Sequence, residues 1–173
     1  MGAVSLQART AAALRRPLDW VDWVVARFVI AIMAMMVLTV SAQVLLRYGF
    51  NVSLDWAEEV SRLCFVWSVF LALPLGIKRG AHVGITLLTD ALPSRVRLAL
   101  FRLTSTLAII LMVVVAREAV RLTMDQWDEP MSTLDYSVGL FILPVAIAAV
   151  HSIPHLLVGA LGEKPATQEL AIE

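Results

Sequence analysis

The sequence predicts an all-α integral membrane protein with four transmembrane helices in a single membrane domain, residues 1–173. Its 173 residues are 60% hydrophobic and 16% charged, whereas soluble domains average about 45–50% and 25%. Four stretches stay apolar over the roughly 20 residues that a helix needs to cross a bilayer core of about 30 Å. None of them alternates with a period of two, as the strands of a membrane barrel do.

The four predicted spans cover about residues 26–46, 56–77, 97–116 and 138–161, and a polar tail follows at 162–173. The first apolar run is longer than the core of a secretory signal peptide, and no small-residue cleavage site follows it. We therefore expect the first span to stay in the protein. The second span carries its charged residues in its first turns, and the third carries Arg102 near its start, as expected where a helix meets the membrane interface.

The distribution of basic residues predicts the orientation. Ten of the fourteen Lys and Arg residues lie in the N-terminal segment up to Arg27, in the connection between the second and third spans and the first turns of the third, or in the tail. The positive-inside rule then places both termini in the cytoplasm. The connection 117–137 holds two arginines against five acidic residues and is expected to face outward.

The connection between the second and third spans mixes apolar and basic residues and includes Arg79 and His82. It is interpreted either as an amphipathic helix lying on the inner membrane surface or as a loop with a short helix. Both interpretations remain open.

Composition also excludes several functions. Fourteen basic residues balance fourteen acidic ones, so no broad basic surface for nucleic acid is expected. The single cysteine, Cys64, rules out a disulfide framework or a thiolate zinc cage within the chain. We expect membrane lipid as a partner, no nucleic acid, no cofactor, no metal and no catalytic residue.

The fourth span contains two of the three histidines of the chain. His151 and His155 are spaced i,i+4, so they share a helix face and could bind a metal or haem. The third histidine, His82, is remote in sequence, and Pro154 lies between the pair. Packed or interfacial histidines are therefore the favoured interpretation, ahead of a haem- or quinone-binding redox subunit.

No predicted span carries a carboxylate near its middle, although such a group marks most ion and proton paths. This argues against an autonomous small homo-oligomeric transporter or exporter, which is kept as the alternative function.

The densest polar group lies at the outer ends of the first two spans. It consists of Arg47, Tyr48, Asn51, Trp56, Glu58, Glu59 and Arg62. Glu58 and Arg62 have the favourable i,i+4 order for an ion pair, and Arg47 could join them from the neighbouring helix. This corner is either ordinary interfacial anchoring or a docking surface for another membrane protein.

The order of residues along this corner is specific. The run from Arg47 to Arg62, RYGFNVSLDWAEEVSR, is followed by Pro74-Leu75-Gly76 and by Lys78-Arg79-Gly80-Ala81-His82-Val83. It closely resembles the small, Q-type (DctQ-like) membrane subunit of tripartite ATP-independent periplasmic (TRAP) transporters. The resemblance is specific over about residues 47–83 and rests elsewhere on length and the four-helix layout.

The resemblance implies a division of labour in the bacterial inner membrane. A periplasmic solute-binding protein captures an organic acid such as a dicarboxylate, and a large M-type membrane subunit carries it inward by sodium symport. The small permease subunit packs on the large one and steadies it. The corner residues would hold the first two helices together or contact the large subunit, and Arg79 and His82 would serve the inner connection.

Overall fold

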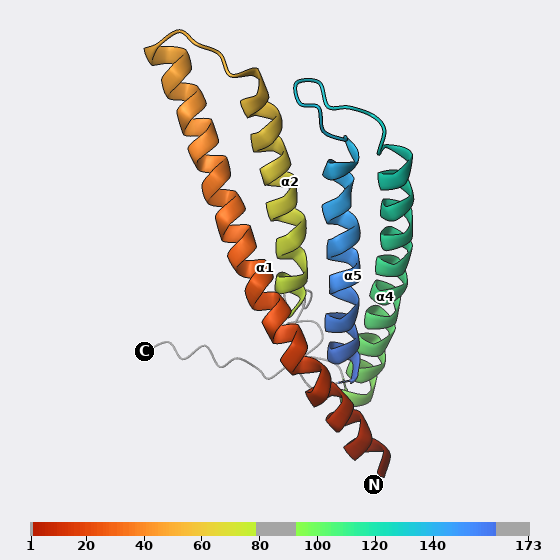
Figure 1. Ribbon diagram of the computed structural model, residues 1–173. Helices are drawn as coiled ribbons and strands as arrows, with labels where there is room; N and C mark the ends of the chain where they lie inside the picture. Colours follow the sequence, from red (N-terminus) through yellow and green to blue (C-terminus); the bar gives the residue numbers. More distant parts are fainter. Residues whose placement is uncertain (1, 79–92, 162–173) are drawn as a thin grey trace, which may run out of the picture.

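The computed structural model describes residues 2–78 and 93–161, which form four helices (Figure 1). They are α1 (Gly2–Gly49), α2 (Asp55–Lys78), α4 (Ser94–Asp125) and α5 (Gly139–Leu161). Each contains a stretch that is long and apolar enough to cross a membrane, which confirms the all-α, four-span prediction. Arg79, His82, the predicted surface helix and the polar tail lie outside the described residues.

Helix α1 is much longer than the predicted first span. Its 48 residues correspond to a length of roughly 72 Å at 1.5 Å per residue. The part suited to cross a membrane, Pro17–Gly49, has 33 residues and still exceeds a bilayer core of about 30 Å. A helix of that length must tilt or project beyond the core. Figure 1 shows α1 inclined across the bundle, with its N-terminal turns reaching past the other helices.

Helix α4 also continues beyond the predicted end of its span, from residue 116 to Asp125. Hydropathy locates only the apolar part of a helix, whereas Arg, Glu and Ala in the added turns are good helix formers. The Thr123 hydroxyl donates to the Ala119 carbonyl oxygen at 2.7 Å, and the Gln126 N–H donates to Leu122 at 3.0 Å. Polar helical turns thus extend this helix beyond its apolar run.

Helix α5 occupies the middle of the bundle, between α2 and α4, and also touches α1 (Figure 1). Its buried face carries small residues, Ala146, Ala148, Ala149 and Ser152. Small side chains let helix backbones approach closely, which is how membrane helices commonly associate. Helix α1 packs mainly along α2, as expected for two helices joined by a short connection.

The helices differ in how much of their apolar surface the chain itself covers. In the most apolar 18-residue window, 39% of the α5 residues are buried, whereas none of the α1 residues is. Large side chains such as Ile30, Leu38 and Leu45 on α1 are more than half exposed. An apolar surface of this extent is stable only against lipid or another protein.

Candidate functional site

The predicted corner lies where α1 turns into α2, at the end of the bundle that carries both the α1–α2 and the α4–α5 connections, here called the hairpin end. Beyond Gly49 the chain reverses at Asn51, whose φ of 57° lies in the left-handed region that Asn tolerates. The backbone N–H groups of Phe50 and Val52 both donate to the Leu46 carbonyl oxygen at 3.1 Å. The turn therefore satisfies part of the C-terminal end of α1 by itself.

Several corner residues point outward. Arg62 and Glu58 form the expected i,i+4 ion pair at 2.8 Å, with both side chains largely exposed. Tyr48 is 81% exposed and Trp56 is 45% exposed. Arg47 forms no ion pair with any other described residue, so the network expected across the turn does not include it.

Glu59 behaves differently, because it reaches the connection between α4 and α5. Its carboxylate accepts the backbone N–H groups of Ser132 and Thr133 at 2.7 and 2.9 Å, and it also accepts the Thr133 hydroxyl. The same connection is closed by Met131 N–H donating to the Tyr136 carbonyl oxygen at 2.8 Å. Glu59 thus links α2 to the other hairpin.

Trp67 makes a second link from α2, deeper in the bundle. Its indole N–H donates to the Leu140 carbonyl oxygen at 2.9 Å. In a regular helix that oxygen would accept the N–H of residue 144, but Pro144 has none. The indole supplies the missing donor, and the Phe28 ring contacts Trp67 edge to face with centroids 6.2 Å apart.

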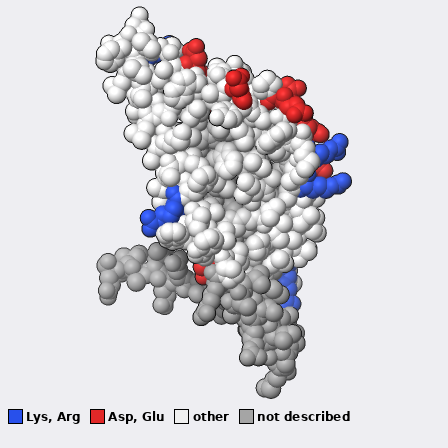
Figure 2. Space-filling model, viewed as in Figure 1, with Lys and Arg blue, Asp and Glu red and all other residues white. Residues whose placement is uncertain are grey.

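Charge is unevenly distributed over the described surface. Figure 2 shows acidic side chains gathered at the hairpin end of the molecule. They come from the first turns of α2 and from the end of α4 and the connection after it: Asp55, Glu58, Glu59, Asp125, Asp128, Glu129 and Asp135. This end of the bundle therefore offers an acidic surface to whatever lies beside it.

The opposite end holds a polar cluster that joins three helices, here called the Asp22 cluster: Asp19, Asp22, Lys78, His151 and His155. Asp22 of α1 is only 5% exposed. One of its oxygens, Oδ2, accepts a hydrogen bond from Lys78 Nζ of α2 at 2.7 Å. The other, Oδ1, lies 3.0 Å from His151 Nε2 and 2.9 Å from His155 Nε2 of α5.

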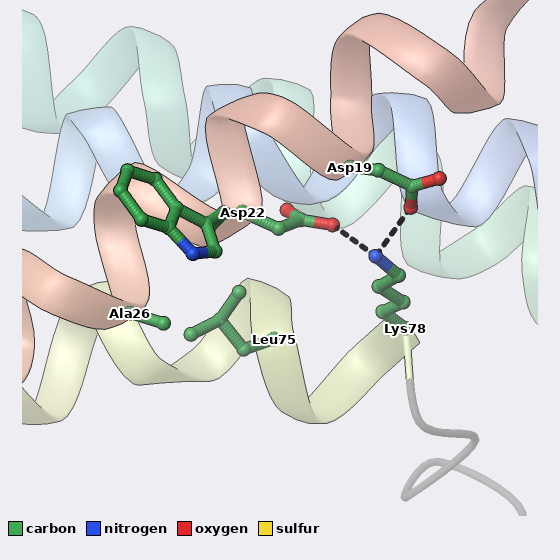
Figure 3. A pocket seen from close by; sticks show the side chains of 6 residues that line it. Asp19, Asp22, Ala26, Leu75 and Lys78 are labelled. Atoms are coloured by element: carbon green, nitrogen blue, oxygen red, sulfur yellow. Dashed lines mark hydrogen bonds and ion pairs between the residues drawn. The ribbon is translucent and has the colours of Figure 1, made fainter.

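Asp19 completes the charge balance of the cluster. Its carboxylate lies 2.6 Å from Lys78 Nζ, so the ammonium bridges two aspartates from neighbouring turns of α1 (Figure 3). Asp19, Asp22 and Lys78 line an open pocket of about 390 Å³, whose walls are completed by Trp23, Ala26 and Leu75. The cluster is therefore buried on its histidine side and open on its lysine side.

Sequence reasoning did not single out Asp19 or Asp22, because both precede the predicted first span. For the two histidines it considered only neighbouring residues of α5 and His82, so no residue on a facing helix was available to complete a site. Asp22 supplies a facing carboxylate from a helix more than a hundred residues away in the chain. Two features of the sequence could have indicated the cluster: Asp19 and Asp22 are spaced i,i+3, and His151 and His155 are spaced i,i+4, so each pair shares a helix face.

This geometry defines a small multi-pass membrane protein whose polar groups link helix ends while wide apolar faces stay uncovered. The chain belongs to the family described as "Tripartite ATP-independent periplasmic transporters, DctQ component", whose model matches residues 36–162. The family resemblance found in the corner sequence is thus confirmed, and the matched region covers the last turns of α1 and all of α2, α4 and α5.

The chain is similar to proteins of this family that are named for different solutes. The chain is 36% identical over 74 residues to the C4-dicarboxylate TRAP transporter small permease protein DctQ of Vibrio cholerae, covering 42% of this chain and 32% of that protein. It is 34% identical over 71 residues to the sialic acid TRAP transporter small permease protein SiaQ of the same organism, covering 41% of each.

A third relative is much longer than this chain. The chain is 26% identical over 141 residues to the isethionate TRAP transporter permease protein DctMQ of Oleidesulfovibrio alaskensis, covering 75% of this chain but 22% of that protein. The chain spans less than two thirds of the length of each of these curated relatives.

Proposed function

We propose that this chain is the small permease subunit of a TRAP-type secondary transporter. It packs on a large M-type membrane subunit and steadies it during sodium-driven uptake of an organic acid, which a periplasmic binding protein delivers. The observation that carries the proposal is the uncovered α1 helix: none of its most apolar window is buried within the chain. The match to a segment of the longer DctMQ permease supports a partner of that kind.

The proposed mechanical role agrees with the internal links. Glu59 joins α2 to the α4–α5 connection, Trp67 joins α2 to α5, and Asp22 joins α1 to α2 and α5. Links at both ends make the bundle a stiff unit. A stiff unit can broaden a larger scaffold without carrying solute itself.

Placement in the cell belongs to the same proposal. The chain is a single multi-pass domain in the bacterial inner membrane, with both termini in the cytoplasm and the hairpin end facing the periplasm. The exposed corner residues Arg47, Tyr48, Trp56 and Arg62 are proposed to contact the large subunit. Asn51 shapes the turn that presents them, and Arg79 and His82 are proposed to serve the cytoplasmic connection.

The first experiment is purification of tagged chain from its native membrane in mild detergent, followed by mass spectrometry of the proteins recovered with it. A large multi-spanning permease in near-equal amount is the expected result. A partner-free homo-oligomer that moves solute in liposomes would overturn the proposal and favour the autonomous transporter. Asp22 would then be the first carboxylate to examine, because it is buried although it is paired with Lys78.

The corner can be tested in the same preparation. Arg62→Glu places two acids four residues apart, and the double variant Glu58→Lys with Arg62→Glu restores an internal pair with reversed order. If Arg62 contacts the large subunit, both variants lose the partner. Recovery of the partner by the double variant alone would show that the pair acts only within α2.

A further inference from the structure

We propose that Asp22, His151 and His155 form a binding site for a divalent transition-metal ion of the Zn²⁺ type. The proposal is independent of the transport role, because it concerns only how α1 is fastened to α5. Two imidazoles and one carboxylate are a donor set that proteins use for zinc and for other first-row metals. Such a site leaves at least one coordination position open.

The spacing of the donor atoms supports a shared ion. One oxygen of Asp22 and one ring nitrogen of each histidine all lie within 4.8 Å of one another. Asp22 Oδ1 is 2.9 and 3.0 Å from the two Nε2 atoms. Two ligands bound tetrahedrally to zinc at 2.0–2.1 Å lie about 3.3 Å apart. The Asp22–imidazole separations therefore need to grow by only a few tenths of an ångström.

Two neighbouring charged residues, Lys78 and Asp19, orient the Asp22 carboxylate and set the net charge around it. Lys78 holds Asp22 Oδ2 at 2.7 Å and leaves Oδ1 directed at the imidazoles. Hydrogen bonds to the second oxygen of a ligating carboxylate are typical of metal sites, because they fix its orientation. Asp19 offsets the ammonium charge at 2.6 Å, so the two carboxylates and Lys78 together retain one negative charge for an incoming cation.

Metal binding does not require either imidazole ring to gain or lose a proton. With neutral rings and no metal, each histidine can donate its Nε2–H to Asp22 Oδ1. Metal binding requires the Nε2 lone pairs, so each ring keeps its single proton at Nδ1 instead. The open pocket is lined by Asp22 and Lys78, so an ion can reach the Asp22 carboxylate from that side, whereas His155 is buried.

A bound ion would strengthen the less extensive of the packing contacts of α1. That helix packs mainly along α2 and touches α5 over a smaller region. Asp22 comes from α1 and both histidines from α5, so metal coordination would join these two helices directly. Loss of the ion would leave only hydrogen bonds between them at this point.

The test uses the full chain, purified with a tag that contains no histidine and stripped of metal by a chelator. Zn²⁺ is titrated in competition with a chromophoric chelator, and X-ray absorption is recorded on the loaded protein. The expected results are one tight site per chain and a first shell of N/O ligands at about 2.0–2.1 Å that includes two imidazoles.

Variants separate this site from adventitious binding. Asp22→Asn, His151→Gln and His155→Gln should each weaken Zn²⁺ binding by at least the roughly 10–100-fold that loss of a supporting residue costs. The controls are His82→Gln, which removes the remaining histidine, and Glu58→Gln, which removes a carboxylate at the hairpin end. Both controls should bind Zn²⁺ as the unmodified chain does.

Three results would overturn the proposal: no tight site in the unmodified chain, an absorption spectrum without two imidazoles, or equal binding by the ligand variants. The spectrum of the unmodified chain decides the matter even if Asp22→Asn fails to fold. The single histidine variants keep the Asp22–Lys78 pair and provide the independent check.

Discussion

Replacing Asp22 with alanine should destabilise the protein far more than the same change three residues earlier, at Asp19. Asp22 is buried and makes one ion pair and two imidazole hydrogen bonds to two other helices. The Asp19 side chain is 60% exposed, and its only ion pair among the described residues is with Lys78. Both substitutions remove an aspartate from α1, so the gain in helix propensity on going to alanine is shared and cancels.

The magnitude follows from counting the lost interactions. Hydrogen bonds between helices of membrane proteins contribute about 0.6 kcal/mol on average and up to about 1.7 kcal/mol each. Three of them, one charge-assisted, give a loss of about 2–5 kcal/mol for Asp22→Ala. An exposed ion pair contributes about 0–1 kcal/mol, which bounds the effect of Asp19→Ala.

The assay is thermal unfolding of the purified chain in one detergent, with a chelator present so that no bound metal contributes. For a chain of this size, about 2–5 kcal/mol corresponds to a fall in Tm of roughly 4–20 °C. Asp19→Ala should lower Tm by no more than a few degrees. Equal shifts for the two variants would refute the argument, because they would mean that burial and the contacts to α5 add nothing to the Lys78 pair.

Three further predictions test other links. Glu59→Gln should speed amide hydrogen exchange in the α4–α5 connection, because the carboxylate that accepts two of its N–H groups is lost. Glu58→Gln should leave the exchange unchanged, and equal exchange rates in the two variants would contradict the link through Glu59. Asn51→Val should lower stability by about 1–2 kcal/mol in thermal unfolding, and Asn51→Gly should not, because a φ of 57° brings the Cβ of most L residues too close to the following carbonyl oxygen, whereas glycine has no Cβ. Trp67→Phe leaves the Leu140 carbonyl oxygen without its indole donor and should cost about 0.6–1.7 kcal/mol by the same measurement; an unchanged Tm would exclude that role.

The number and order of the spans could be predicted because each needs only one local property, an apolar run of sufficient length. The true ends of α1 and α4 could not, since their polar turns are helical without being apolar. The Glu58–Arg62 pair was predictable from i,i+4 spacing alone. The partners of Glu59 and Asp22 were not, because they lie 56 to 133 residues away and meet only once the helices pack.

The links within the bundle leave one helix face free. Asp22 fixes α1 at the end of the bundle opposite the hairpin end, the short turn at Asn51 fixes it at the hairpin end, and Phe28 contacts Trp67 between them. All these contacts point toward α2 and α5, so the opposite apolar face of α1 takes part in none of them. A large membrane partner could cover that face without breaking any internal hydrogen bond. If α1 is the interface, apolar-to-polar changes on it should abolish copurification of the partner while leaving the fold intact.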